Sequence, residues 1–126
     1  MTAEEFTQKY AEVVFWSAIS GTLANLIRVP GRRPPRDLVD ASAWYIALNE
    51  ADRAMVRWLI ADAAHAAAFG ALAMIDGVRP TGPDHYELVA VDADGVRTPV
   101  NDQSRNLHDL FQSLVVAQDG TLIVRA

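Results

Sequence analysis

The chain contains no cysteine and only one lysine, Lys9, among its 126 residues. The absence of cysteine excludes disulfides, thiolate metal sites and cysteine nucleophiles. The seven glycines are scattered, and none forms a phosphate-binding GxxxxGK or GxGxxG pattern. No serine occupies a GxSxG turn, which excludes the nucleophile arrangement of the α/β-hydrolases. The common sequence signatures of catalysis are therefore missing.

A targeting or membrane-spanning segment is not expected either. The first five residues carry two acids, whereas a secretory signal begins with positive charge. The longest uncharged run, Val13 to Ile27, contains four polar residues and is shorter than the ~20 apolar residues that a spanning helix needs. We therefore expect a cytoplasmic protein that does not contact a membrane.

The composition is that of an ordinary globular domain. Hydrophobic residues make up 51% of the chain and charged residues 21%, a balance typical of folded rather than disordered proteins. The length is close to the commonest domain size. We therefore expect one domain over residues 1–126.

The first part of the chain has the periodicity of helices. Thr2 and Glu5 form a capping-box pattern, and apolar residues follow at helical spacing. This helix must end before Pro30, because the residue that precedes a proline avoids helical dihedral angles. A proline-rich loop over 29–37 and a short helix over 40–48 are expected next. Within the first helix, the Ser20-Gly21-Thr22 segment allows a kink.

A long third helix is predicted from Asn49, which suits the N-cap, to Gly77, which suits the C-cap. Its segment 63–75 carries no charge on any face, which is typical of a helix at the centre of a core. We therefore expect its apolar stripe to be buried. The stripe consists of Met55, Val56, Leu59, Ala63, Ala66, Ala67, Gly70 and Met74.

The last third of the chain changes to strand patterns. Segments 85–91 and 96–100 flank an Asp-Gly turn and predict a β-hairpin. Segment 107–115 has the spacing of an amphipathic helix, and 121–124 is predicted as a last strand. The fold class is therefore α+β. The N-terminal two thirds are mostly helical, and a β-hairpin, an amphipathic helix and a final strand in a small antiparallel sheet follow.

The histidines do not have the spacing of a metal site. Zinc needs three or four ligands on a rigid frame, and no HExxH-type spacing links His65, His85 and His108. We interpret His65 as a core or boundary residue and the other two as surface residues. Asp62 shares a helix face with His65. The sequence predicts no catalytic, cofactor-binding or metal site, and a small enzyme or ligand-binding domain with a site near His65 and His85 is the alternative.

The charge distribution suggests a binding surface. The chain has a net charge of −5, and 84–119 holds seven acids and two bases. A negative surface of this kind steers association with a basic partner. The basic loop at 29–37 contains no aromatic residue for base stacking, which argues against nucleic acid. The candidate partner-binding residues are Asp84, Glu87, Asp92, Asp94 and Asp109, with Arg32, Arg33 and Trp44 as secondary candidates.

The segment from Tyr86 to Phe111, which reads YELVAVDADGVRTPVND and then LHDLF, resembles a bacterial protein family. It is similar to the C-terminal portion of small bacterial proteins, some of which act as immunity partners of contact-dependent or secreted toxins. The resemblance implies a non-enzymatic module that binds a cognate toxin domain. It carries over no functional residue, because such proteins bind through different surfaces. A homo-oligomeric scaffold built on the alanine-rich helix is a further alternative.

Overall fold

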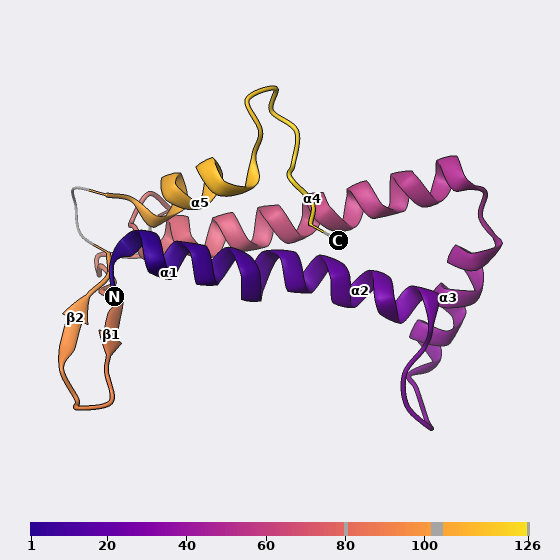
Figure 1. The fold of residues 1–126 in the computed structure, drawn as a ribbon, viewed down its shortest axis with the longest axis horizontal. Coiled ribbons are helices and arrows are strands. Elements are labelled where there is room, and N and C mark those ends of the chain that lie inside the picture. The colour runs from indigo at the N-terminus through magenta and orange to yellow at the C-terminus, as the bar shows by residue number, and fades with distance from the viewer. Residues whose placement is uncertain (80, 102–104, 126) are drawn as a thin grey trace.

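The computed structural model describes residues 1–79, 81–101 and 105–125, and most of them are helical. The elements are α1 (Ala3–Tyr10), η1 (Ala11–Trp16), α2 (Ser17–Ile27), α3 (Arg36–Ala47), α4 (Glu50–Ile75), β1 (Val89–Val91), β2 (Arg97–Pro99) and α5 (Leu107–Val115). Figure 1 shows two long antiparallel helical segments, joined by α3 at one end, with the hairpin at the other end. The predicted helical N-terminal part and the hairpin that follows it are confirmed.

The first helix is continuous from α1 through η1 to α2. Thr2 and Glu5 form the predicted capping box at its start. The η1 segment is a π-helix, in which the backbone N–H and the hydroxyl of Ser17 both donate to the carbonyl of Glu12. The wider turn lets the consecutive side chains of Phe15 and Trp16 both face inward. The first helix is therefore irregular at η1. No kink occurs at Gly21, where one was predicted, because α2 continues through this residue.

Helix α3 links the two long segments and begins earlier than predicted, at Arg36. The hydroxyl of Ser42 donates to the carbonyl of Leu26 at 2.6 Å, which fastens α3 to the end of α2. At the other end of α3, the guanidinium of Arg53 donates to the carbonyl of Tyr45 at 3.3 Å. The same carbonyl also accepts the backbone N–H of Leu48 at 3.2 Å, so the end of α3 is held by a backbone donor and by a side-chain donor from α4.

Helix α5 packs against both long segments and contributes Leu107, Phe111 and Val115 to the core. The ring of Phe111 is fully buried, with its centroid 5.6 Å from Tyr10, 5.7 Å from Phe15 and 6.0 Å from His65. Tyr10 joins α1 to α4, because its hydroxyl donates to the carbonyl of Ala68 at 2.8 Å. Burial raises the pKa of Tyr10, which keeps this hydroxyl protonated and able to donate.

The burial of α4 is the reverse of the prediction. Its buried residues are Ala61, Ala68, Leu72 and Ala73, whereas Met55, Leu59, Ala63, Ala66, Ala67 and Met74 of the predicted stripe are exposed. The helix has apolar residues on both sides, and periodicity alone does not reveal which side meets a neighbour. On the buried side, the small side chains of Ala61 and Ala68 let the other helices approach closely.

The hairpin is confirmed with shorter strands than predicted. Strands β1 and β2 are antiparallel, with Val89 opposite Pro99 and Val91 opposite Arg97. Gly95 has a φ of 80°, a conformation that suits glycine and closes the turn. The side chain of Asn101 extends the pairing, since its oxygen accepts from the backbone N–H of Leu88 at 2.6 Å.

The predicted final strand is wrong. In the described part of the chain, 121–124 makes only an isolated bridge, between Val116 and Leu122. The tail is instead held against the first helix, because the indole N–H of Trp16 donates to the carbonyl of Ile123 at 2.8 Å. The guanidinium of Arg125 also lies 3.8 Å from the centre of the Trp16 ring. These anchors hold the tail away from the hairpin, so it cannot join the sheet.

We expect Phe111→Ala to lower the free energy of unfolding by about 3–5 kcal/mol, because it leaves a cavity between three helical segments. Urea denaturation followed by circular dichroism would measure this loss. The control is Val13→Ala, since Val13 is 71% exposed and its truncation should change stability by less than about 0.5 kcal/mol. Equal effects of the two variants would contradict the assigned core.

Candidate functional site

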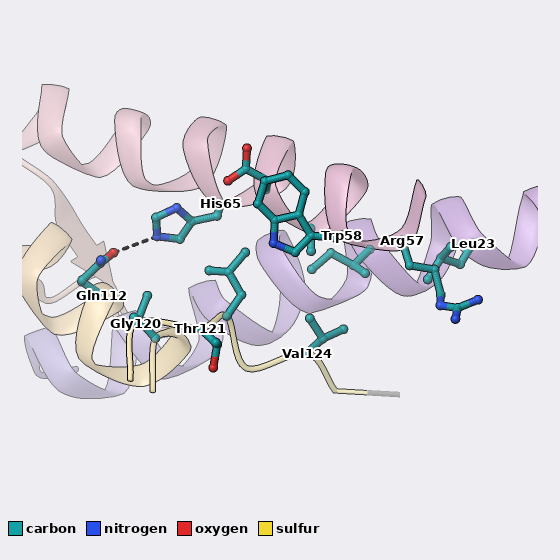
Figure 2. Close-up of a pocket in the computed structure, with 13 residues that line it drawn as sticks. Leu23, Arg57, Trp58, His65, Gln112, Gly120, Thr121 and Val124 are labelled. Carbon is teal, nitrogen blue, oxygen red and sulfur yellow. Dashed lines mark hydrogen bonds between the residues drawn. The ribbon is translucent and has the colours of Figure 1, made fainter. Parts of the chain in front are cut away.

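A groove of about 590 Å³ lies between α2, α4, the end of α5 and the C-terminal tail. Its size falls within the range of small-ligand sites, about 300–1,000 Å³. The lining is mostly apolar, with polar groups from Arg57, Asp62, His65, Gln112 and Thr121. Figure 2 shows His65 and Trp58 of α4 on one side and Thr121 and Val124 of the tail on the other.

His65 is held in place at the inner end of the groove. Its Nε2 lies 2.7 Å from the side-chain oxygen of Gln112, as Figure 2 shows. Its ring stacks on Phe69 and Phe111, at centroid distances of 5.8 and 6.0 Å. The partner of Nε2 is an amide, which cannot take up a proton as a carboxylate does. The pair therefore offers a fixed hydrogen-bonding group in an apolar groove.

Asp62 lies one turn before His65 on α4 and is exposed. None of the hydrogen bonds or ion pairs described for the chain joins the two side chains. The predicted common helix face is confirmed by the position of both residues on the groove lining. Asp62 is thus free to meet a group that enters the groove.

The outer end of the groove carries a charged and an aromatic side chain. The guanidinium of Arg57 lies 2.6 Å from the carboxylate of Glu50 and 3.3 Å from the hydroxyl of Tyr45. Arg57 lowers the pKa of Glu50 in two ways. The hydrogen bond that it donates has the larger effect, and its positive charge has the smaller one. Trp58 is 54% exposed next to this pair. An exposed tryptophan beside a groove is typical of the anchoring residues of protein interfaces.

The other two histidines lie away from this groove. His85 lines a separate hollow of about 410 Å³ together with Glu87 and Asn101. The structure therefore does not bring His65 and His85 together in one pocket. No group of three or more histidine, aspartate or glutamate side chains in the described ranges could hold a metal ion.

The interpretation of His108 as a surface residue is wrong. His108 is buried, and its Nδ1 lies 2.6 Å from the carboxylate of Asp76. The same carboxylate oxygen accepts the backbone N–H of His108 at 2.9 Å, so Asp76 caps the first turn of α5. A signal for this partner existed in the sequence, because an acid at the C-terminal end of a helix is unfavourable unless something pairs with it.

The candidate acidic residues all lie at the hairpin end of the molecule and are exposed. Asp92 and Asp94 belong to the turn between β1 and β2, which projects from the helices in Figure 1. Asp84 and Glu87 precede β1, and Asp109 lies in the first turn of α5. One further acid of the predicted tract, Asp102, lies outside the described residues.

The secondary candidates lie at the opposite end. Arg32 and Arg33 are exposed in the loop before α3, and Trp44 on α3 is 57% exposed. Arg36 of the same region lies 3.9 Å from Asp40, while Arg32 and Arg33 meet no carboxylate of the described chain. Figure 1 places α3 and the hairpin far apart, so the acidic and basic candidates cannot form one patch.

Comparisons with protein-family models, with curated proteins and with solved structures find no match to this chain. Sequence reasoning missed Gln112 and Arg57 as groove residues. Gln112 is separated from His65 by most of the C-terminal half, so only the packing of α5 against α4 could bring them together.

Asp92 differs from the other candidate acids because its carboxylate stabilises the turn. One of its oxygens accepts the backbone N–H groups of both Asp94 and Val96 at 2.9 Å. We expect Asp92→Ala to weaken the turn by about 1 kcal/mol, which speeds hydrogen exchange of the Val96 amide roughly fivefold. The matched control, Asp94→Ala, should leave that exchange unchanged. Nuclear magnetic resonance would measure both rates, and similar rates in the two variants would contradict this role.

Proposed function

We propose that the protein is a non-enzymatic protein-binding module that acts as an immunity protein and neutralises a cognate bacterial toxin domain. The observation that carries the proposal is the set of exposed carboxylates at the hairpin end, from Asp84, Glu87, Asp94 and Asp109. Asp94 lies in the turn of a hairpin that projects beyond the helices (Figure 1), whereas Asp84 and Glu87 precede its first strand and Asp109 lies in the first turn of α5. A projecting acidic unit can enter a basic cleft without any change in the helical core.

Three of these carboxylates are available to a partner. Among the described residues, Asp84, Glu87 and Asp94 form no ion pair, whereas Asp109 lies 3.3 Å from the Nε2 of His108. Exposed charges that no ion pair neutralises contribute to the field around the molecule. The hairpin end can therefore attract a positively charged domain over the distance that salt screening allows.

The chemistry of the partner follows from that charge. A toxin that cuts or binds nucleic acid needs lysines and arginines to hold phosphates. An inhibitor that covers such a surface is best made acidic, since complementary charge raises the association rate and rejects unsuitable partners. The resemblance of the segment from Tyr86 to Phe111 to immunity proteins falls on the hairpin and α5, which carry these acids.

The groove supports a second candidate function, the binding of a small molecule. Its volume of about 590 Å³ and its fixed His65–Gln112 pair are features of a pocket with a few oriented polar groups. A ligand that quenches Trp58 fluorescence and loses affinity in Gln112→Ala would favour this function over the first.

We expect the double reversal Glu87→Lys with Asp94→Lys to slow association with a basic toxin domain roughly tenfold at low salt. Asp92 is left intact because it stabilises the turn. The toxin domain is first sought in the gene next to this one. Stopped-flow binding to that domain would give the rate, and survival of bacteria that express it would give the protection.

The control carries the same change of charge away from the hairpin, in Glu12→Lys with Asp40→Lys. It should keep nearly the original rate and the original protection. If both double variants bind and protect alike, the hairpin is not the interface. If the unaltered chain gives no protection, the immunity function itself is wrong.

A further inference from the structure

The chain exposes far more surface than a monomer of its mass. Its accessible surface is 8,601 Å² at 13.8 kDa. Folded monomers of that mass expose about 6,600 Å², so the excess is about 2,000 Å². Part of the excess is apolar, because Met55, Leu59 and Met74 of α4 are exposed.

Helix α4 contributes an apolar strip to this excess, bordered by the exposed Asp62 next to Leu59 and Ala66. This helix is long and apolar enough to cross a membrane, as core helices of soluble proteins also can be. Only 22% of its most apolar 18-residue segment is buried, however. Its outward side forms what we term the outer stripe, consisting of Met55, Leu59, Ala63, Ala66, Gly70 and Met74. These residues recur every three or four positions and so share one side of the helix.

We propose that the outer stripe of α4 is a dimer interface that binds a second copy of this chain, with the two α4 helices antiparallel. The order of side-chain sizes supports a two-fold axis at the middle of the stripe. Around an axis midway between Ala63 and Ala66, Met55 of one copy lies level with Met74 of the other. Leu59 then lies level with Gly70, and Ala63 with Ala66. The stripe is complementary to itself, as a symmetric dimer requires.

The centre of the stripe is suited to close packing. Alanine and glycine let two helix backbones approach to the short end of the usual interaxial range, about 8 Å. Leu59 of one copy then packs against Gly70 of the other copy, and the missing side chain of the glycine leaves room for the leucine. In the monomer, Gly70 is approached by Arg79, whose Nη1 lies 2.8 Å from the place of a Cβ at Gly70. Arg79 is exposed, so its tip can move aside.

The charges at the two ends of the stripe are complementary in the same orientation. Asp52 lies on this side of α4 one turn before Met55, and it is exposed. Arg79 follows the other end of α4, and its guanidinium, which lies against Gly70 and Phe69 in the single chain, must swing outward to reach a second copy. An antiparallel pair brings Asp52 of each copy towards Arg79 of the other, whereas a parallel pair brings like charges together. Two antiparallel helices also align their dipoles favourably.

The area agrees with a stable dimer. If each copy buries about half of its excess, the pair removes about 2,000 Å² from water, which is the lower end of the range for obligate homodimers. A membrane surface fits less well. Helices that lie on membranes are rich in lysine and arginine on their polar side, whereas this chain has a net charge of −5.

Analytical ultracentrifugation of the full chain tests the proposal. The unaltered chain should sediment at twice 13.8 kDa. Ala66→Asp places a charge at the middle of the interface and should raise the dimer dissociation constant by about 100-fold or more. Because Ala66 is exposed in the single chain, the helical circular dichroism should persist. The control Ala54→Asp, on an exposed position away from the stripe, should remain dimeric.

Cross-linking tests the orientation, since the chain has no cysteine of its own. Met55→Cys and Met74→Cys chains, one of them carrying a size tag, are mixed and oxidised. The antiparallel dimer should give the mixed disulfide and little of either homodisulfide.

Four results would overturn the proposal: a monomeric unaltered chain, an Ala66→Asp chain that stays dimeric, homodisulfides in place of the mixed product, or binding of the unaltered chain to phosphatidylglycerol vesicles that Ala66→Asp abolishes. The hairpin is not involved in any of these measurements, so their outcome is independent of the proposed function.

Discussion

The insertion of Phe111 between the two long helices is the packing interaction on which the rest of the structure depends. Its ring meets Tyr10 and Phe15 from the first helix and His65 from α4. Helix α5 thereby acts as a wedge that contacts both α1 and α4. Asp76 holds the start of this wedge through the backbone N–H of His108, and the tail beyond it is held by Trp16. One short helix therefore organises the core, the groove and the course of the tail.

A single wedge also explains why so much apolar surface stays exposed. Two antiparallel helices have two broad faces, and α5 with the tail covers only part of one of them, as Figure 1 shows. Helix α4 is apolar on both sides, and its side away from α5 exposes Met55, Leu59 and Met74. The same open construction leaves the groove beside His65 accessible. The unusual surface area and the candidate binding surfaces thus have a common structural origin.

Local features were predicted well because they depend on neighbours in the sequence. The Thr2–Glu5 capping box, the N-cap at Asn49 and the helix over Leu107–Val115 are confirmed. Each depends on hydrogen bonds or spacing within a few residues. The η1 segment was missed because a π-turn forms when two adjacent aromatic side chains are both drawn into a core, and the sequence alone does not show that core.

The sequence by itself determined where the helices and the hairpin lie and that the hairpin end is acidic, since these follow from spacing, caps and charge. Only the tertiary structure decided which side of α4 is buried, that His108 is inside with Asp76, and that the tail is held at Trp16 instead of joining the sheet. The physical reason is that apolar periodicity shows which residues can be buried, whereas the partner that buries them comes from a distant part of the chain. For α4, the buried side is the one on which α5 and the first helix pack, and the opposite side of the helix stays exposed.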